Sequence, residues 1–73
     1  MAEVTFNIEK KLGVLSTTAK GWNKELNLVS WNGSSPKYDL RSWSSDNSQM
    51  SKGITLSKEE MVALKEILNS LQL

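Results

Sequence analysis

The sequence predicts an α+β fold in which an antiparallel sheet of four strands is followed by one C-terminal helix. Most of the chain up to Leu56 consists of short segments in which apolar and polar residues alternate with a period of two, as in half-buried strands. From Ser57 onward, apolar residues instead recur at helical spacing after a helix-start motif. A chain of 73 residues has room for one domain, so we predict a single domain over residues 1–73.

Turn-forming and polar segments separate the predicted strands. Gly13 marks a kink or bulge within the first strand, and the run Asn32–Pro36 joins the second and third strands into a hairpin. Residues 44–51 are strongly polar and predict a loop, partly mobile, before the fourth strand. The predicted strands cover Val4–Ile8 with a continuation through Leu12–Leu15, Lys24–Asn32, Lys37–Ser44 and Lys52–Leu56.

The predicted helix runs from Ser57 to about Leu71. Ser57 and Glu60 form a capping box, in which each side chain accepts a hydrogen bond from the backbone amide of the other. The apolar stripe of this helix is broader than one small sheet needs, so either it contacts a second subunit or some apolar residues stay exposed. A small domain without disulfides needs other support, which favours a homodimer. The predicted dimer interface consists of Met61, Leu64, Leu68 and Leu71.

A single helix covers only one face of a sheet, so the other face is solvated or binds a ligand. The residues predicted to face the helix are Phe6, Ile8, Leu26, Leu28, Tyr38, Leu40, Ile54 and Leu56. The residues predicted on the uncovered face are Asn27, Val29, Trp31, Lys37, Asp39, Arg41 and Trp43.

The composition argues against catalysis and metal binding. The sequence has no His and no Cys, which removes the commonest general base, the commonest metal ligand and any disulfide. It contains no G-x-S-x-G motif and no glycine-rich phosphate loop. We therefore predict a protein that is not an enzyme and needs no cofactor and no metal. No signal peptide or long apolar run is evident, so the expected location is the cytoplasm, with nucleoid association as an open alternative.

The charge distribution is more informative than the net charge of +1. Residues 10–58 contain eight Lys or Arg against three Asp or Glu, whereas the rest of the chain has one against five. All three Trp also lie in the basic segment. A basic, aromatic-rich middle is typical of a face that binds a polyanion, although an uneven surface without function would give the same count.

The predicted uncovered face suits unpaired nucleotides. Indoles and guanidinium groups stack on bases, and such stacking requires a single strand, either of DNA or of RNA. Each Trp could instead pack in the core, and Arg41 could simply pair with Asp39. A second possibility is that the aromatic face docks another protein in an interaction or dimerisation module. The nucleic-acid-binding candidates are Lys20, Trp22, Lys24, Asn27, Trp31, Lys37, Asp39, Arg41, Trp43, Lys52 and Gly53.

Three stretches of the sequence resemble the positive-cofactor-four family of transcriptional coactivators, and most closely its small bacterial, YdbC-like members. The resemblance runs from about Phe6 to Leu68. Its most specific parts are the strand D39-L-R-S-W43 and the segment K52-G-I-T-L-S57 that leads into a helix. The stretches are K20-G-W-N-K-E-L-N-L-V-S-W-N32, P36-K-Y-D-L-R-S-W43 and K52-G-I-T-L-S-K-E-E60.

The resemblance implies a homodimer with a curved four-stranded sheet in each subunit. It also implies binding of single-stranded DNA with little sequence preference, in support of transcription or of replication and repair, and contact with that machinery. Arg41 and Lys52 match the arginine and the lysine at the family's nucleic-acid groove. Trp43 matches an aromatic of the same groove, with a spacing that differs by one residue from the eukaryotic pattern, so the stacking residue stays open.

Overall fold

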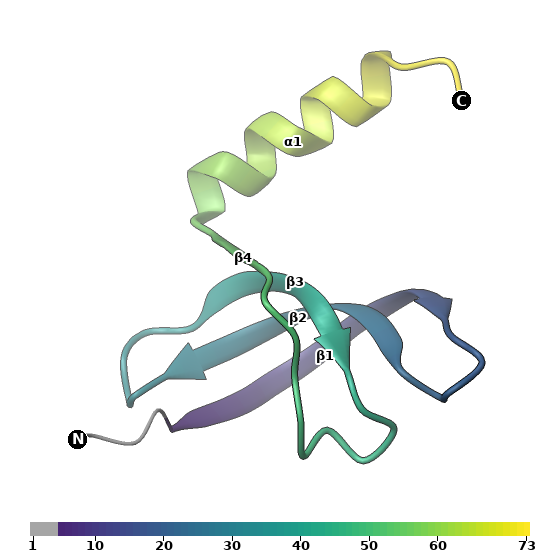
Figure 1. Cartoon of the computed structure of the whole chain (residues 1–73). Helices are drawn as coiled ribbons and strands as arrows, with labels where there is room; N and C mark the ends of the chain where they lie inside the picture. The colour runs from purple at the N-terminus through teal and green to yellow at the C-terminus, as the bar shows by residue number, and fades with distance from the viewer. Residues whose placement is uncertain (1–4) are drawn as a thin grey trace.

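The computed structural model describes residues 5–73. Its elements follow the predicted order, with all strand pairs antiparallel and the strands arranged β1-β2-β3-β4 across the sheet. The predicted ββββα fold is therefore confirmed, and Figure 1 shows the helix after the last strand. The elements are β1 (Phe6–Thr17), β2 (Asn23–Trp31), β3 (Lys37–Trp43), β4 (Ile54–Leu56) and α1 (Lys58–Ser70).

The predicted hairpin turn between β2 and β3 is confirmed in detail. Asn32 and Gly33 have positive φ values of 50° and 77°, and the Ser34 amide donates to the Trp31 carbonyl over 2.9 Å. These features define a type I′ turn, which Asn-Gly favours because both residues tolerate the left-handed conformation.

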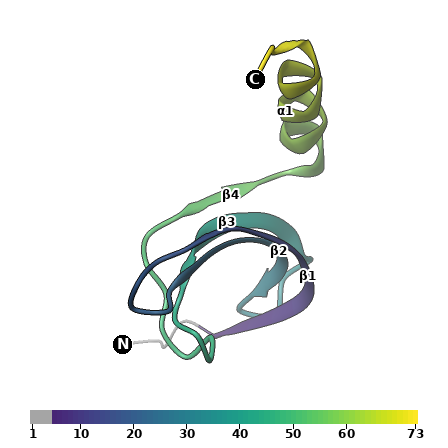
Figure 2. The ribbon, with the colours of Figure 1, turned by 90° about the vertical axis from the view of Figure 1, so that its right-hand side faces the viewer.

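The first strand is longer and less regular than predicted. It is one strand of 12 residues paired with the nine residues of β2, and the pairing shifts at three places. Glu9, Leu12 and Leu15 are the extra residues, and Gly13 keeps a partner in Leu26. The predicted start at Val4 lies outside the described residues. Each bulge bends its strand, so three in succession curve the sheet. Figure 2 shows β1, β2 and β3 bending into a trough, with α1 outside that curve.

The pairing of β1 with β2 overturns part of the predicted face assignment. Phe6 lies opposite Trp31 and Ile8 lies opposite Val29, and directly paired residues point to the same face. Phe6 and Ile8 therefore point away from the helix, not toward it. Alternation within a strand shows which residues share a face. It does not show whether that face points toward the helix or away from it, and this information comes from the register between strands.

We call the face of the sheet that points away from α1 the inner face, and it holds the core. The prediction that this face lies open to solvent is wrong for most of its central residues. Curvature is the physical reason, because it brings side chains of a concave face together until they shield one another from water. Among residues 5–73, the buried residues are Glu25, Asn27, Val29, Asp39 and Trp43, and the strand register places all of them on the inner face.

The other face of the sheet, which we call the outer face, looks toward α1 without being filled by it. None of the residues of α1 is buried. A groove of about 710 Å³ separates the helix from the sheet. Of the eight residues predicted to face the helix, Leu26, Tyr38, Leu40 and Leu56 line this groove. The other lining residues are Leu15, Lys58, Met61, Val62, Leu64, Lys65, Leu68 and Asn69.

The start of α1 forms as predicted. The Glu60 amide donates to Ser57 Oγ over 3.1 Å, and the Ser57 amide donates to Glu60 Oε1 over 2.8 Å. This reciprocal pair satisfies two amides that the helix itself cannot satisfy. The helix ends at Ser70, and Leu71 is its C-terminal cap residue.

Candidate nucleic-acid interface

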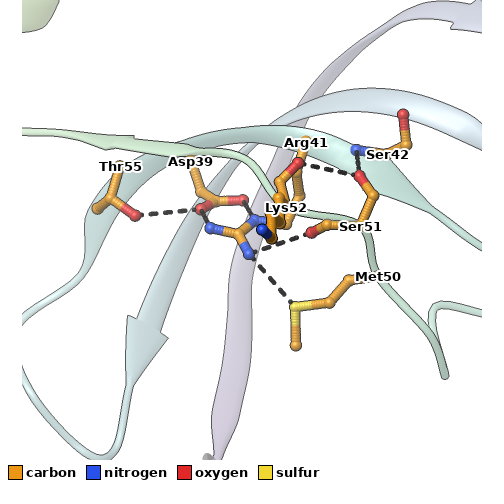
Figure 3. A network of polar contacts seen from close by, with 7 residues as sticks. All are labelled: Asp39, Arg41, Ser42, Met50, Ser51, Lys52 and Thr55. Atoms are coloured by element: carbon orange, nitrogen blue, oxygen red, sulfur yellow. Dashed lines mark hydrogen bonds and ion pairs between the residues drawn. The ribbon is translucent and has the colours of Figure 1, made fainter.

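An ion pair between Arg41 and Asp39 is the centre of the candidate site. Both residues lie on β3, two positions apart, and therefore point to the same face of the strand. Arg41 Nε and Nη2 donate to the two carboxylate oxygens of Asp39, each over 2.7 Å (Figure 3). Asp39 is fully buried, and its Oδ1 also accepts from Thr55 Oγ1 over 3.3 Å. The alternative in which Arg41 pairs with Asp39 is confirmed, but at a buried position rather than on the surface.

Three aromatic rings lie beside this ion pair on the inner face. The Arg41 guanidinium carbon is 4.7 Å from the Trp31 ring centroid, a cation–π geometry. Phe6 bridges the two indoles, with ring centroids 5.9 Å from Trp31 and 5.1 Å from Trp43. Trp43 is fully buried, so its ring is part of the core, whereas Trp31 is only half-buried.

Arg41 also holds the segment that follows the loop after β3. Its Nη1 donates to the Ser51 carbonyl over 3.4 Å and contacts Met50 Sδ at 3.5 Å. The Ser51 amide donates to the Ser42 carbonyl over 2.9 Å, and the Ser42 amide donates to Ser51 Oγ over 3.2 Å. Residues 50 and 51 are thereby tied to β3, as Figure 3 shows.

Gly53 makes the closest approach to β3. A Cβ atom at this position would lie 2.3 Å from Arg41 Cβ and 2.4 Å from the Leu40 carbonyl oxygen, too close for any side chain. The sequence analysis predicted Gly53 as a nucleic-acid-binding residue. In the structure, the position that a Cβ atom of residue 53 would occupy faces β3 and not a ligand.

A shallow hollow of about 340 Å³ lies where this segment meets the sheet. It brings together four of the predicted site residues, namely Lys24, Arg41, Lys52 and Gly53. Lys24 comes from β2 and Lys52 from the segment before β4, and both are exposed. Two exposed lysines that line one hollow form a place that attracts an anion such as a phosphate. The other lining residues are Leu40, Ser42, Ser51 and Ile54.

The remaining predicted residues do not join the hollow. Lys20 is exposed and Trp22 is half-buried, and both lie in the connection between β1 and β2. Lys37 is exposed at the start of β3. Asn27, like Trp43, is fully buried on the inner face.

A second polar network closes the trough between β1 and the loop at residues 44–50. Asn27 Nδ2 donates to Glu25 Oε1 over 2.9 Å, and Asn47 Nδ2 reaches the same oxygen over 3.4 Å. Lys11 Nζ donates to Asn47 Oδ1 over 2.7 Å, which links β1 to the loop. Sequence reasoning missed Glu25, Asn47 and Lys11, because residues so far apart in the chain carry no local pattern.

The predicted loop at residues 44–51 contains several hydrogen bonds within itself, and its partial mobility stays a prediction. Asp46 Oδ1 accepts from the amide and the hydroxyl of Ser48, over 2.9 and 2.6 Å, and from Ser44 Oγ over 2.9 Å. The Ser48 hydroxyl, the Ser48 amide and the Ser44 hydroxyl together lower the pKa of Asp46 from 3.8 to about 2. The carboxylate therefore acts as the organising acceptor of the loop.

Sequence reasoning also missed Met50, Ser51 and Thr55 as partners of the ion pair, and Ser42 as a partner of Ser51. Only Ser51 had a usable signal, its place directly before the Lys52-Gly53 motif. Within residues 5–73, no three His, Cys, Asp or Glu side chains cluster as a metal site would require. No helix formed by those residues has the length and apolarity needed to cross a membrane.

Comparison with known protein families identifies the family of this chain. The family described as Transcriptional Coactivator p15 (PC4) matches residues 18–67, more than half of the chain. The chain belongs to the PC4 family. The PC4 match includes all of β2, β3 and β4, and therefore the ion pair and the hollow. PC4 proteins bind nucleic acid and are not enzymes, and the resemblance noted in the sequence is confirmed at the level of this family.

A bacterial relative is similar over almost the entire chain. A protein of Treponema pallidum (strain Nichols), described as uncharacterized, is 48% identical over 68 residues, which cover 93% of this chain and 80% of that protein. This similarity includes β1, which lies outside the PC4 match, because 68 of the 73 residues are aligned. The YdbC-like subgroup stays a prediction.

Proposed function

We propose that this protein binds single-stranded DNA with little sequence preference, without catalysis, and supports transcription or DNA replication and repair in the cytoplasm. The observation that carries the proposal is the hollow of a PC4-family chain that Lys24, Arg41 and Lys52 line. The guanidinium of Arg41 lies over the indole of Trp31 on the inner face. Cations that pair with phosphates and aromatic faces that stack on bases are the two requirements for binding an unpaired strand.

The helix is a poor alternative for reading duplex DNA. It stands away from the sheet, as a recognition helix would, but it carries Glu59, Glu60 and Glu66 against two lysines. An acidic helix is repelled by the phosphates that border a major groove. The sheet side of the molecule is the better candidate.

We further propose that the binding unit is a homodimer in which a second copy fills the groove between α1 and the outer face. The groove between them is almost entirely apolar, and no residue of α1 is buried. A monomer of this size with an unfilled groove has little apolar burial to stabilise it. The α1 helix of a second copy carries the same apolar residues and would fill this groove. Of the predicted interface residues, Met61, Leu64 and Leu68 line the groove, and Leu71 is exposed just after the helix.

The rival function, an aromatic face that docks another protein, has less support. Val29 and Trp43 are already buried within this chain, so the inner face has little free apolar area to offer. A docking surface needs exposed aromatic anchors.

The test is a titration of the protein with oligo-dT, followed by tryptophan emission at two salt concentrations. We expect quenching at low salt and a log–log salt slope of about −0.7 for each phosphate neutralised. Quenching that does not depend on salt would show that the lysines and Arg41 do not bind phosphates, and no binding by a folded protein would refute the proposal. Repeating the titration with oligo-U measures the preference for DNA over RNA.

A further inference from the structure

We infer that Arg41 is a positioning residue rather than a phosphate ligand, and that the Asp39–Arg41 pair fixes residues 50–53 so that Lys52, together with Lys24, contacts the phosphate. The inference rests on the proposed function and assigns separate roles within its site.

The hydrogen bonds of Arg41 support this assignment. Each of its three nitrogens donates to a group of its own chain, namely the two Asp39 oxygens and the Ser51 carbonyl. One side of the guanidinium lies over Trp31 at 4.7 Å, and the side chain is only 13% exposed. A bidentate carboxylate also cancels its charge locally. Arg41 has little left with which to bind an external anion.

What Arg41 does hold is the backbone on both sides of Lys52. On one side, it donates to Ser51, whose amide is bonded to the Ser42 carbonyl over 2.9 Å. On the other side, Gly53 lies so close to Arg41 Cβ and to the Leu40 carbonyl oxygen that a Cβ atom would not fit. Lys52 is thus fixed at its backbone while its side chain is exposed. Lys24 lines the same hollow from β2 and is also exposed.

Two substitutions at the ion pair separate positioning from direct contact. Arg41→Lys keeps the positive charge but cannot form the bidentate pair. Positioning predicts a loss of oligo-dT affinity on the order of tenfold, as large as that of Arg41→Gln. Direct contact predicts that the lysine restores most of the affinity. Asp39→Asn adds one unit of net positive charge. If Arg41 is a positioning residue, Asp39→Asn should weaken oligo-dT binding in spite of the added charge. If Arg41 contacts the phosphate directly, binding should be equal or tighter.

A double-mutant cycle then tests whether Arg41 acts through Lys52. In the wild-type background, Lys52→Gln should weaken binding on the order of tenfold and reduce the salt slope by about 0.7. In the Arg41→Lys background, Lys52→Gln should have less than about half of that effect, because the loss of the ion pair has already displaced Lys52 from the hollow. Lys10→Gln removes a positive charge from β1 outside the hollow and serves as the matched control, with no loss expected. Additive losses for Arg41→Lys and Lys52→Gln would overturn the inference.

Amide hydrogen exchange gives a reading that needs no nucleic acid. The Ser51 amide should exchange faster in Arg41→Lys than in the wild type, while amides in the middle of β2 stay protected. Unchanged protection of Ser51 would overturn the positioning role. If Asp39→Asn does not fold, as circular dichroism would reveal, Thr55→Val replaces it, because it removes only the hydrogen bond from Thr55 to Asp39. Absence of oligo-dT binding by the wild type would refute the proposed function, and the exchange measurement would still decide the role of Arg41.

Discussion

Phe6 of β1 and Trp43 of β3 lie in contact across the trough, with ring centroids 5.1 Å apart and ring planes inclined by 52°. They belong to strands that are separated in the sheet by β2. The contact is possible only because the sheet is curved, since next-but-one strands of a flat sheet are about 10 Å apart. Phe6 therefore links the bulged first strand to the strand that carries Arg41.

Phe6→Ala should destabilise the fold by about 2 kcal/mol, less than the loss at a fully buried phenylalanine because Phe6 is half-buried. The substitution removes its ring contacts with both Trp31 and Trp43. Urea denaturation at a fixed protein concentration measures the change in the free energy of unfolding. Val14→Ala on the same strand is the control, because Val14 is 57% exposed. Equal effects of the two substitutions would show that the trough is not the core.

Local features of this fold could be predicted from the sequence, and long-range features could not. The capping box at Ser57 and the turn at Asn32-Gly33 depend on residues at most three positions apart, and both form as predicted. The face on which Phe6 lies depends on three bulges in β1 and on its register with β2. No alternation pattern within a single strand contains that information.

In the candidate site, too, local features could be predicted from the sequence and long-range features could not. The motif around Lys52-Gly53 and the strand with Arg41 were both identified from the sequence, and the structure brings them together at one hollow. The sequence left open whether Trp43 packs in the core, because the alternation of its strand is the same in a flat sheet and in a curved one, and the structure shows that it does. The partners of Arg41 at Met50 and Ser51 were missed because they follow a loop whose course depends on its own hydrogen bonds.

Gly53→Ala should weaken both the fold and the binding of oligo-dT. The added methyl group would lie 2.3 Å from Arg41 Cβ, so residues 51–53 must move away from β3. Overpacking of this kind costs about 1–3 kcal/mol of stability. Gly13→Ala is the matched control, since nothing lies within 4 Å of its added Cβ. We expect a lower urea midpoint for Gly53→Ala alone, and equal midpoints for the two variants would contradict the close approach.

The stability of the protein should depend on Asp46 in acid. The folded-state pKa of Asp46 is about 2, below its ordinary value of 3.8, so the unfolded chain binds the proton more readily. The stabilisation is complete above the ordinary value and is lost as the pH falls toward 2. The difference in urea midpoint between the wild type and Asp46→Asn should therefore shrink across this window. Ser48→Ala should raise the Asp46 pKa in a carboxyl NMR titration, because Ser48 supplies the largest lowering effect.

Leu68→Glu should dissociate the proposed homodimer, because it places a carboxylate in the apolar groove between α1 and the outer face. Burying an unpaired charge at an interface is strongly unfavourable, so we expect a shift toward monomer in sedimentation velocity. Ile67→Glu is the matched control. Ile67 is the neighbouring helix residue, is exposed to a similar degree (56% against 49% for Leu68), and does not line the groove. It should leave the sedimentation coefficient unchanged. A wild-type protein that sediments as a monomer, or equal behaviour of the two variants, would show that a second copy does not fill this groove.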